Sequence, residues 1–129
     1  MNVGRIRVLV VDDSHNFLEG MKTLYERDPL IRIVGVASTG MEALDMVERL
    51  RPDLVLLDVR MHPMGGFETL RQLKADPAAP VVVLTTFLGN EPECRAAAHA
   101  GADRFVEKSR IVEGLADIAR QMAATPLSD

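Results

Sequence analysis

Several residue types are scarce in this chain of 129 residues, which has one cysteine, no tryptophan and only 4% aromatic residues. The single cysteine, Cys94, excludes an internal disulfide framework and is typical of a reducing compartment. We therefore expect a cytoplasmic protein. Because aromatic residues are few, the core is expected to consist of valine, isoleucine, leucine and alanine, which favours an α/β fold.

The chain also lacks an excess of basic residues and any long apolar run. Its 15 basic and 19 acidic residues give a net charge of −4, so direct binding to nucleic acid is not expected. No uninterrupted apolar segment approaches the ~20 residues that span a bilayer, and the N-terminus does not resemble a secretory signal. We therefore expect no membrane contact.

The length fits one compact domain, and a 47% hydrophobic fraction argues against disorder. We assign residues 1–124 to this domain and residues 125–129 to a polar C-terminal tail. Apolar segments alternate five times with segments of helical periodicity, which predicts a parallel sheet covered on both faces. The expected strands are 5–11, 31–36, 54–58, 81–85 and 104–106. A doubly wound (βα)5 sandwich with strand order 2-1-3-4-5 suits this pattern.

Helix ends carry their own signals. Ser14 and Ser109 are expected to cap the first and last helices, and Thr39 to Glu42 form a capping-box pattern before the second. Gly101 is expected to end the fourth helix in a left-handed conformation.

Acidic residues stand where the first and third strands end. Asp12 and Asp13 follow the first strand, and Asp58 ends the third. Strands one and three are neighbours in the expected order, so three carboxylates meet at the carboxyl edge of the sheet, where open α/β sheets bind ligands. Mutual repulsion requires a compensating charge, and Mg²⁺ with oxygen ligands supplies it most simply.

A hydroxyl and an ammonium complete this edge. Thr85 or Thr86 ends the fourth strand, and Lys108 follows the fifth. Carboxylates, Mg²⁺, a hydroxyl and a lysine together are suited to holding a phosphoryl group on one carboxylate, which then acts as a nucleophile.

Four segments in chain order resemble the receiver domain of two-component response regulators. They are Val-Val-Asp-Asp-Ser (10–14), Pro-Asp-Leu-Val-Leu-Leu-Asp-Val-Arg-Met (52–61), Leu-Thr-Thr-Phe (84–87) and Ala-Gly-Ala-Asp-Arg-Phe-Val-Glu-Lys (100–108). The resemblance covers residues 5 to 123 and implies the flavodoxin-like, CheY-like fold.

The resemblance implies a metal site and a phosphoacceptor. Asp58 would accept a phosphoryl group from a sensor histidine kinase or a phosphotransfer protein. Asp12, Asp13 and Asp58 would hold Mg²⁺ together with the backbone carbonyl of Arg60, with Asp13 a direct ligand.

The resemblance also implies a switch. Thr85 would be the switch hydroxyl, Phe105 the switch aromatic residue and Lys108 the lysine that binds the phosphoryl group. Phosphorylation would change the face formed by the fourth helix, fifth strand and fifth helix, which would bind an effector or a second copy of the chain. No turnover of an external metabolite is expected.

The sequence departs from the family pattern at three places. His62 stands where the family usually has proline, with Pro63 after it, and Ser109 stands where proline usually follows the lysine. The segment from Thr85 to Lys108 is one residue longer than usual, which leaves Thr85 and Thr86 as alternative switch hydroxyls and predicts an unusual loop at 88–90. We prefer Thr85 because it directly follows the apolar strand.

Alternative functions remain at this point. A receiver-like interaction module could bind its partner without phosphorylation, although the acidic pair, acceptor and lysine are all present. A Mg²⁺-dependent aspartyl phosphatase is disfavoured, because that class places its carboxylates as Asp-x-Asp whereas Asp12 and Asp13 are adjacent. The chain would be either a stand-alone regulator or the N-terminal receiver of a longer transcriptional regulator.

Overall fold

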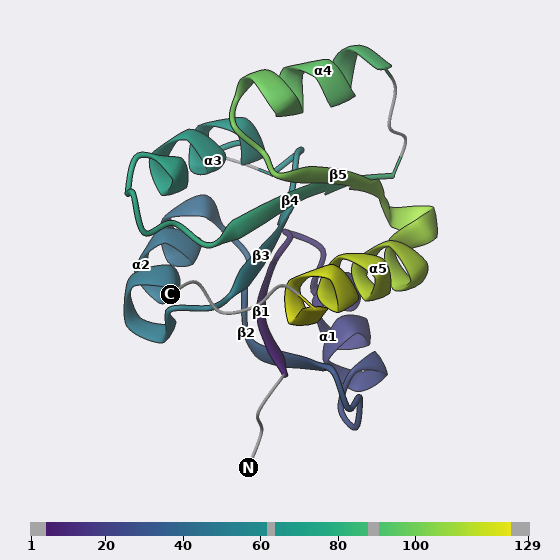
Figure 1. Ribbon diagram of the computed structural model, residues 1–129. Helices are drawn as coiled ribbons and strands as arrows, with labels where there is room; N and C mark the ends of the chain where they lie inside the picture. Colours follow the sequence, from purple (N-terminus) through teal and green to yellow (C-terminus); the bar gives the residue numbers. More distant parts are fainter. Residues whose placement is uncertain (1–4, 62–63, 88–90, 125–129) are drawn as a thin grey trace.

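The computed structural model describes residues 5–61, 64–87 and 91–124, which form one parallel sheet with helices on both faces (Figure 1). The strands lie in the order β2-β1-β3-β4-β5, which confirms the predicted fold. Their bounds are β1 Ile6–Val11, β2 Ile31–Ala37, β3 Leu54–Asp58, β4 Val81–Thr86 and β5 Arg104–Glu107. The helices are α1 His15–Leu24, α2 Gly40–Leu50, α3 Gly66–Lys74, α4 Glu91–His99 and α5 Ile111–Ala124.

Alternation along the buried strands divides the core into two layers. Val8 and Val10 of β1 pack in a cluster with residues of α1 and α5, whereas Leu9 and Val11 pack in a cluster with residues of α2, α3 and α4. All four are fully buried. Figure 1 shows the same division, with α1 and α5 together on one side of the sheet. This alternation decides which layer each residue at a strand end adjoins.

The first two predicted caps are confirmed. The Ser14 side chain accepts a hydrogen bond from the Phe17 N–H, and the Thr39 side chain accepts one from the Glu42 N–H. The Glu42 carboxylate accepts from the Ser38 N–H, one residue before the position that the capping box predicts. After α4, Gly101 has the expected positive φ of 100°.

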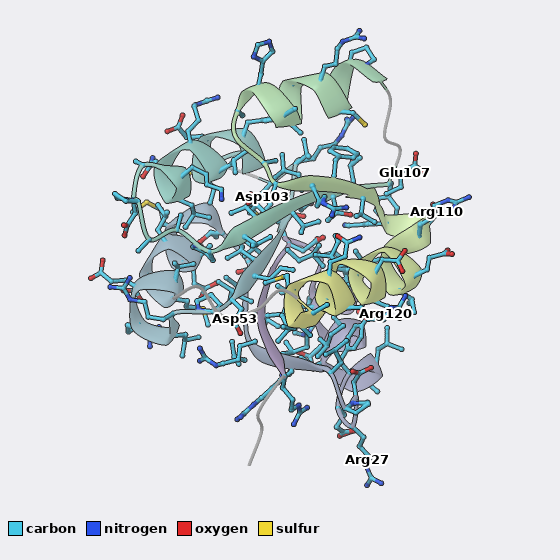
Figure 2. All side chains as sticks on the ribbon, in the orientation of Figure 1. Arg27, Asp53, Asp103, Glu107, Arg110 and Arg120 are labelled. Atoms are coloured by element: carbon cyan, nitrogen blue, oxygen red, sulfur yellow. The ribbon has the colours of Figure 1, made fainter. Side chains whose placement is uncertain are left out.

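The prediction that Ser109 caps the last helix is wrong. A 3₁₀ turn, Lys108–Arg110, comes between β5 and α5, and the Ser109 hydroxyl donates to the Glu107 carboxylate. Arg110 points away from the sheet at this turn (Figure 2). The turn leaves Lys108 buried at the carboxyl edge of the sheet.

Other sequence predictions lie outside the described residues, namely those for His62, Pro63, the loop at 88–90 and the tail at 125–129. Among the residues that are described, none of the helices has the length and apolar character of a membrane span.

Candidate functional site

The three predicted carboxylates meet at the carboxyl edge of the sheet. Oxygen atoms of Asp12, Asp13 and Asp58 all lie within 4.8 Å of one another. Adjacent parallel strands cause this meeting, because Val11 at the end of β1 pairs with Leu57, the residue before Asp58 in β3. Asp12 is fully buried and Asp58 is 6% exposed, whereas Asp13 is exposed.

Backbone donors fix two of these carboxylates. The Ser14 N–H donates to Asp12 Oδ1 at 2.8 Å, and the Arg60 N–H donates to Asp58 Oδ1 at 3.2 Å. In both, the N–H donor is two residues after its aspartate, so the tight turns that leave the sheet also orient the acidic side chains. Arg60, whose carbonyl is a predicted metal ligand, lines a cavity together with all three aspartates, which we call the acidic cavity.

The Asp58 carboxyl has a pKa above its ordinary value. Burial is the main cause, and the nearby Asp12 carboxylate adds to it, with a smaller contribution from Asp13. The hydrogen bond from the Arg60 N–H and the charge of Lys108 act in the opposite direction but do not cancel the increase. The ionised form of Asp58 is therefore less favourable here than in an exposed carboxyl.

Lys108 lies in the site but pairs with Asp12. Its Nζ is 2.5 Å from Asp12 Oδ2, and both side chains are almost completely buried. The sequence predicted only that Lys108 lies at this edge of the sheet. At the start of the 3₁₀ turn, its ammonium lies directly against one of the three carboxylates.

The two threonines of β4 have different surroundings. Thr85 is paired in register with Asp58, so both side chains belong to the same layer, that of α1 and α5. Its hydroxyl is buried and has no hydrogen-bond partner among the described residues. Thr86 lines the acidic cavity. Both threonines therefore lie at this edge of the sheet, with different surroundings.

Phe105 lies apart from the acidic cavity. Its partner in β4 is Leu84, and it packs, partly buried, against the core layer of α2, α3 and α4. It also lines a surface cavity of about 340 Å³ together with Cys94 and Arg110. The partner of Thr85 in β5 is Val106, the residue directly after Phe105.

The acidic cavity has a volume of about 360 Å³. Its lining residues are Asp12, Asp13, Ser14, Asp58, Arg60, Thr86, Phe87 and Lys108. The sequence did not predict one feature of this cavity. The Lys108 ammonium lies 4.5 Å from the ring centroids of both Phe17 and Phe87. Phe17 has the spacing of a core residue of α1. Phe87 directly follows a threonine at the end of a strand, and this position was the one sequence signal that placed its ring near the site.

The comparisons with known proteins agree with this arrangement. The sequence profile of the response regulator receiver domain matches residues 8–120. The chain belongs to the response regulator receiver domain family. This receiver domain is 41% identical over 108 residues to a protein-glutamate methylesterase/protein-glutamine glutaminase of Syntrophus aciditrophicus, a match that covers 82% of the chain and 31% of that protein. It is 34% identical to the response regulator protein VraR of Staphylococcus aureus, covering 90% of the chain and 56% of that protein.

Solved structures show the same fold. The response regulator domain of Thermotoga maritima CheB has a TM-score of 0.83 and 28% identity, with 95% of this receiver domain and 98% of that chain covered. The receiver domain of a putative NarL from Mycobacterium tuberculosis has a TM-score of 0.80 and 28% identity, with coverages of 90% and 97%. This receiver domain spans about a third of the length of its methylesterase relatives.

The residues present fit a divalent cation. The cluster offers only carboxylate oxygens, the ligand type that Mg²⁺ prefers. Burial and, after it, the neighbouring carboxylates raise the pKa of Asp58, and a bound cation would offset the repulsion between the carboxylates.

Proposed function

We propose that this receiver domain takes up a phosphoryl group on Asp58 in a Mg²⁺-dependent reaction and thereby changes the partner that it binds. The main observation is the cluster of three carboxylates within 4.8 Å of one another, with a lysine ammonium against one of them. Receiver domains are phosphoacceptors. The enzymatic activity named for the methylesterase relatives therefore does not belong to the matched part of those proteins.

Asp58 is the best placed acceptor of the three carboxylates. It ends β3, lines the cavity, and is not engaged by Lys108, which pairs with Asp12. In the proposed step an Asp58 oxygen forms a bond to phosphorus while the bond from phosphorus to the donor histidine nitrogen breaks. The departing imidazole takes up a proton. The product is an acyl phosphate on Asp58.

The other groups stabilise the transferred charge. Asp13, Asp12 and Asp58, with the Arg60 carbonyl, would hold Mg²⁺, which supplies positive charge to the phosphoryl oxygens when bound. The Lys108 ammonium supplies a second positive charge at the same cavity. The buried Thr85 hydroxyl, which has no partner among the described residues, has a free donor for a phosphoryl oxygen.

The proposed output is a change on the face of α4, β5 and α5. Phe105 lies on this face, beside a cavity of about 340 Å³. Phosphorylation would change the position of the Phe105 ring, and an effector or a second copy of the chain would bind the changed face. Thr85 belongs to the layer of α1 and α5, on the other side of the sheet from Phe105, so its movement would not open space for the ring directly. The donor would be a histidine kinase or phosphotransfer protein in the cytoplasm. Residues 1–124 would act as this unit, alone or ahead of a further domain.

Intact-mass measurement tests the proposal. The receiver domain is incubated with acetyl phosphate and Mg²⁺, and we expect the mass to increase by one phosphoryl group. Asp58→Asn should abolish the increase, and chelation of Mg²⁺ should do the same. Asp53→Asn, at the opposite edge of the sheet, is the matched control and should react normally. An unchanged increase in Asp58→Asn would overturn the proposal.

A further inference from the structure

Two phenyl rings lie against the ammonium of Lys108. Phe17 comes from α1 and Phe87 from the segment directly after β4, and each ring centroid is 4.5 Å from Nζ. The chain has only four phenylalanines, so half of them lie at one nitrogen atom. Distances of this size give a favourable attraction between a cation and the face of an aromatic ring.

Core packing does not account for Phe87. Its side chain is 72% exposed, which is unusual for a ring of this size. It lines the acidic cavity, and the contact that the structure gives its ring is with the Lys108 ammonium. Phe17 differs, since it is partly buried against the core layer of α1 and α5 as well as over Lys108.

The two kinds of contact to Lys108 differ in strength. Its ion pair with Asp12 is short and buried. A charge-assisted hydrogen bond to an anionic oxygen is stronger and more directional than the attraction of a ring face. The two rings therefore restrict the position of the ammonium but bind it less strongly than a second carboxylate would. An incoming anionic oxygen can still gain a hydrogen bond from it.

We propose that Phe17 and Phe87 are positioning residues that hold the Lys108 ammonium at the acidic cavity, ready to meet the phosphoryl group on Asp58. This inference rests on the proposed function of Asp58. Three separate elements, α1, the end of β4 and the turn after β5, converge on one nitrogen atom. Their convergence fixes a long, flexible side chain in the unphosphorylated state and lowers the ordering required during phosphoryl transfer.

Phosphorylation rates test the positioning role. The initial rate with acetyl phosphate and Mg²⁺ is measured for Phe87→Leu and Phe17→Leu over a range of donor concentrations. We expect the maximal rate to fall roughly threefold in each and roughly tenfold in the double variant. Phe87→Tyr keeps an aromatic ring at this position and should retain the wild-type rate. Phe67→Leu, in α3 on the other core layer, is the matched control and should leave the rate unchanged.

A spectroscopic signature tests the contact itself. Ring currents should shift the Lys108 ε-methylene protons upfield in the NMR spectrum of the wild type. Phe87→Leu and Phe17→Leu should each reduce this shift, whereas Phe67→Leu should not. Circular dichroism checks that each variant is folded.

The outcomes separate the two proposals. A wild type that takes up no phosphoryl group on Asp58 would overturn the proposed function. A wild type that reacts, with unchanged or faster rates in both leucine variants, would overturn only the positioning role. A faster Phe87→Leu would mean that the ring obstructs the donor. Absence of the upfield shift in the wild type would also overturn the positioning role.

Discussion

Aspartates stand at both edges of the sheet, and their surroundings differ. At the amino edge, Asp53 Oδ2 accepts a hydrogen bond from the Arg7 N–H at 2.9 Å. Asp103 Oδ2 accepts one from the Val82 N–H at 2.8 Å and lies 2.6 Å from the Lys74 ammonium. Figure 2 labels both aspartates, each directly before a strand. These carboxylates satisfy backbone donors and hold neighbouring strands together.

At the carboxyl edge, three carboxylates crowd together. Asp58 is buried beside Asp12 and Asp13, and its pKa is raised. The Lys108 ammonium lies against Asp12. Asp53 and Asp103 therefore stabilise the fold at one edge, whereas the ionised form of Asp58 is disfavoured in the folded state at the other. This contrast distinguishes a structural aspartate from one suited to a cation and a phosphoryl group.

The largest expected effect on stability comes from Mg²⁺. A ligand at a hundred times its dissociation constant raises the free energy of unfolding by about 2.7 kcal/mol. We expect this increase for the wild type and its loss in Asp13→Ala, measured by thermal unfolding across a Mg²⁺ titration. Asp53→Ala should keep the full response. An equal response in Asp13→Ala would place the cation elsewhere.

The next effect is at the amino edge. Asp103→Ala removes the acceptor for the buried Val82 N–H and the partner of Lys74. We expect the free energy of unfolding to fall by about 2 kcal/mol, mostly from the unsatisfied N–H, because the ion pair is partly exposed. Urea denaturation measures the change. Phosphorylation of the folded variant should be normal. A loss of phosphorylation would contradict a purely structural role for the aspartates at the amino edge.

The smallest effect concerns two buried threonines. The Thr85 hydroxyl has no partner among the described residues, whereas the Thr69 hydroxyl donates to the Gly65 carbonyl at 3.0 Å. Thr69→Val should lower the free energy of unfolding by about 1 kcal/mol, and Thr85→Val should leave it unchanged or raise it. A loss in Thr85→Val as large as in Thr69→Val, measured by urea denaturation, would show that its hydroxyl is already satisfied.

The sequence was sufficient for the sheet and for the gathering of carboxylates. Strand order followed from the alternation of apolar and helical segments, and Asp12 and Asp58 came together because β1 and β3 are adjacent. These features depend on backbone topology, which hydrophobic periodicity specifies. The different surroundings of Thr85 and Thr86 could be assigned only from the structure, which shows that Thr85 pairs with Asp58.

Contacts at the ends of long side chains could not be predicted. Lys108 pairs with Asp12 at the start of a 3₁₀ turn that the sequence did not predict. Phe17 and Phe87 are far apart in sequence, and their contact with one nitrogen depends on the three-dimensional position of a long side chain.

The most direct test of the contrast between the edges is the pH dependence of stability without Mg²⁺. The pKa of Asp58 is raised in the folded state, so ionisation is disfavoured there. The wild type therefore loses stability as pH rises from the ordinary carboxyl range through the raised pKa. Asp58→Asn removes this loss, whereas Asp103→Asn removes a favourable contact.

The measurement is the free energy of unfolding of wild type, Asp58→Asn and Asp103→Asn from acidic to neutral pH. We predict that Asp58→Asn is more stable than the wild type near neutral pH and that its advantage disappears on acidification below the ordinary carboxyl pKa. Asp103→Asn should be less stable than the wild type near neutral pH. An Asp58→Asn variant that is less stable near neutral pH, or whose advantage does not depend on pH, would contradict the account.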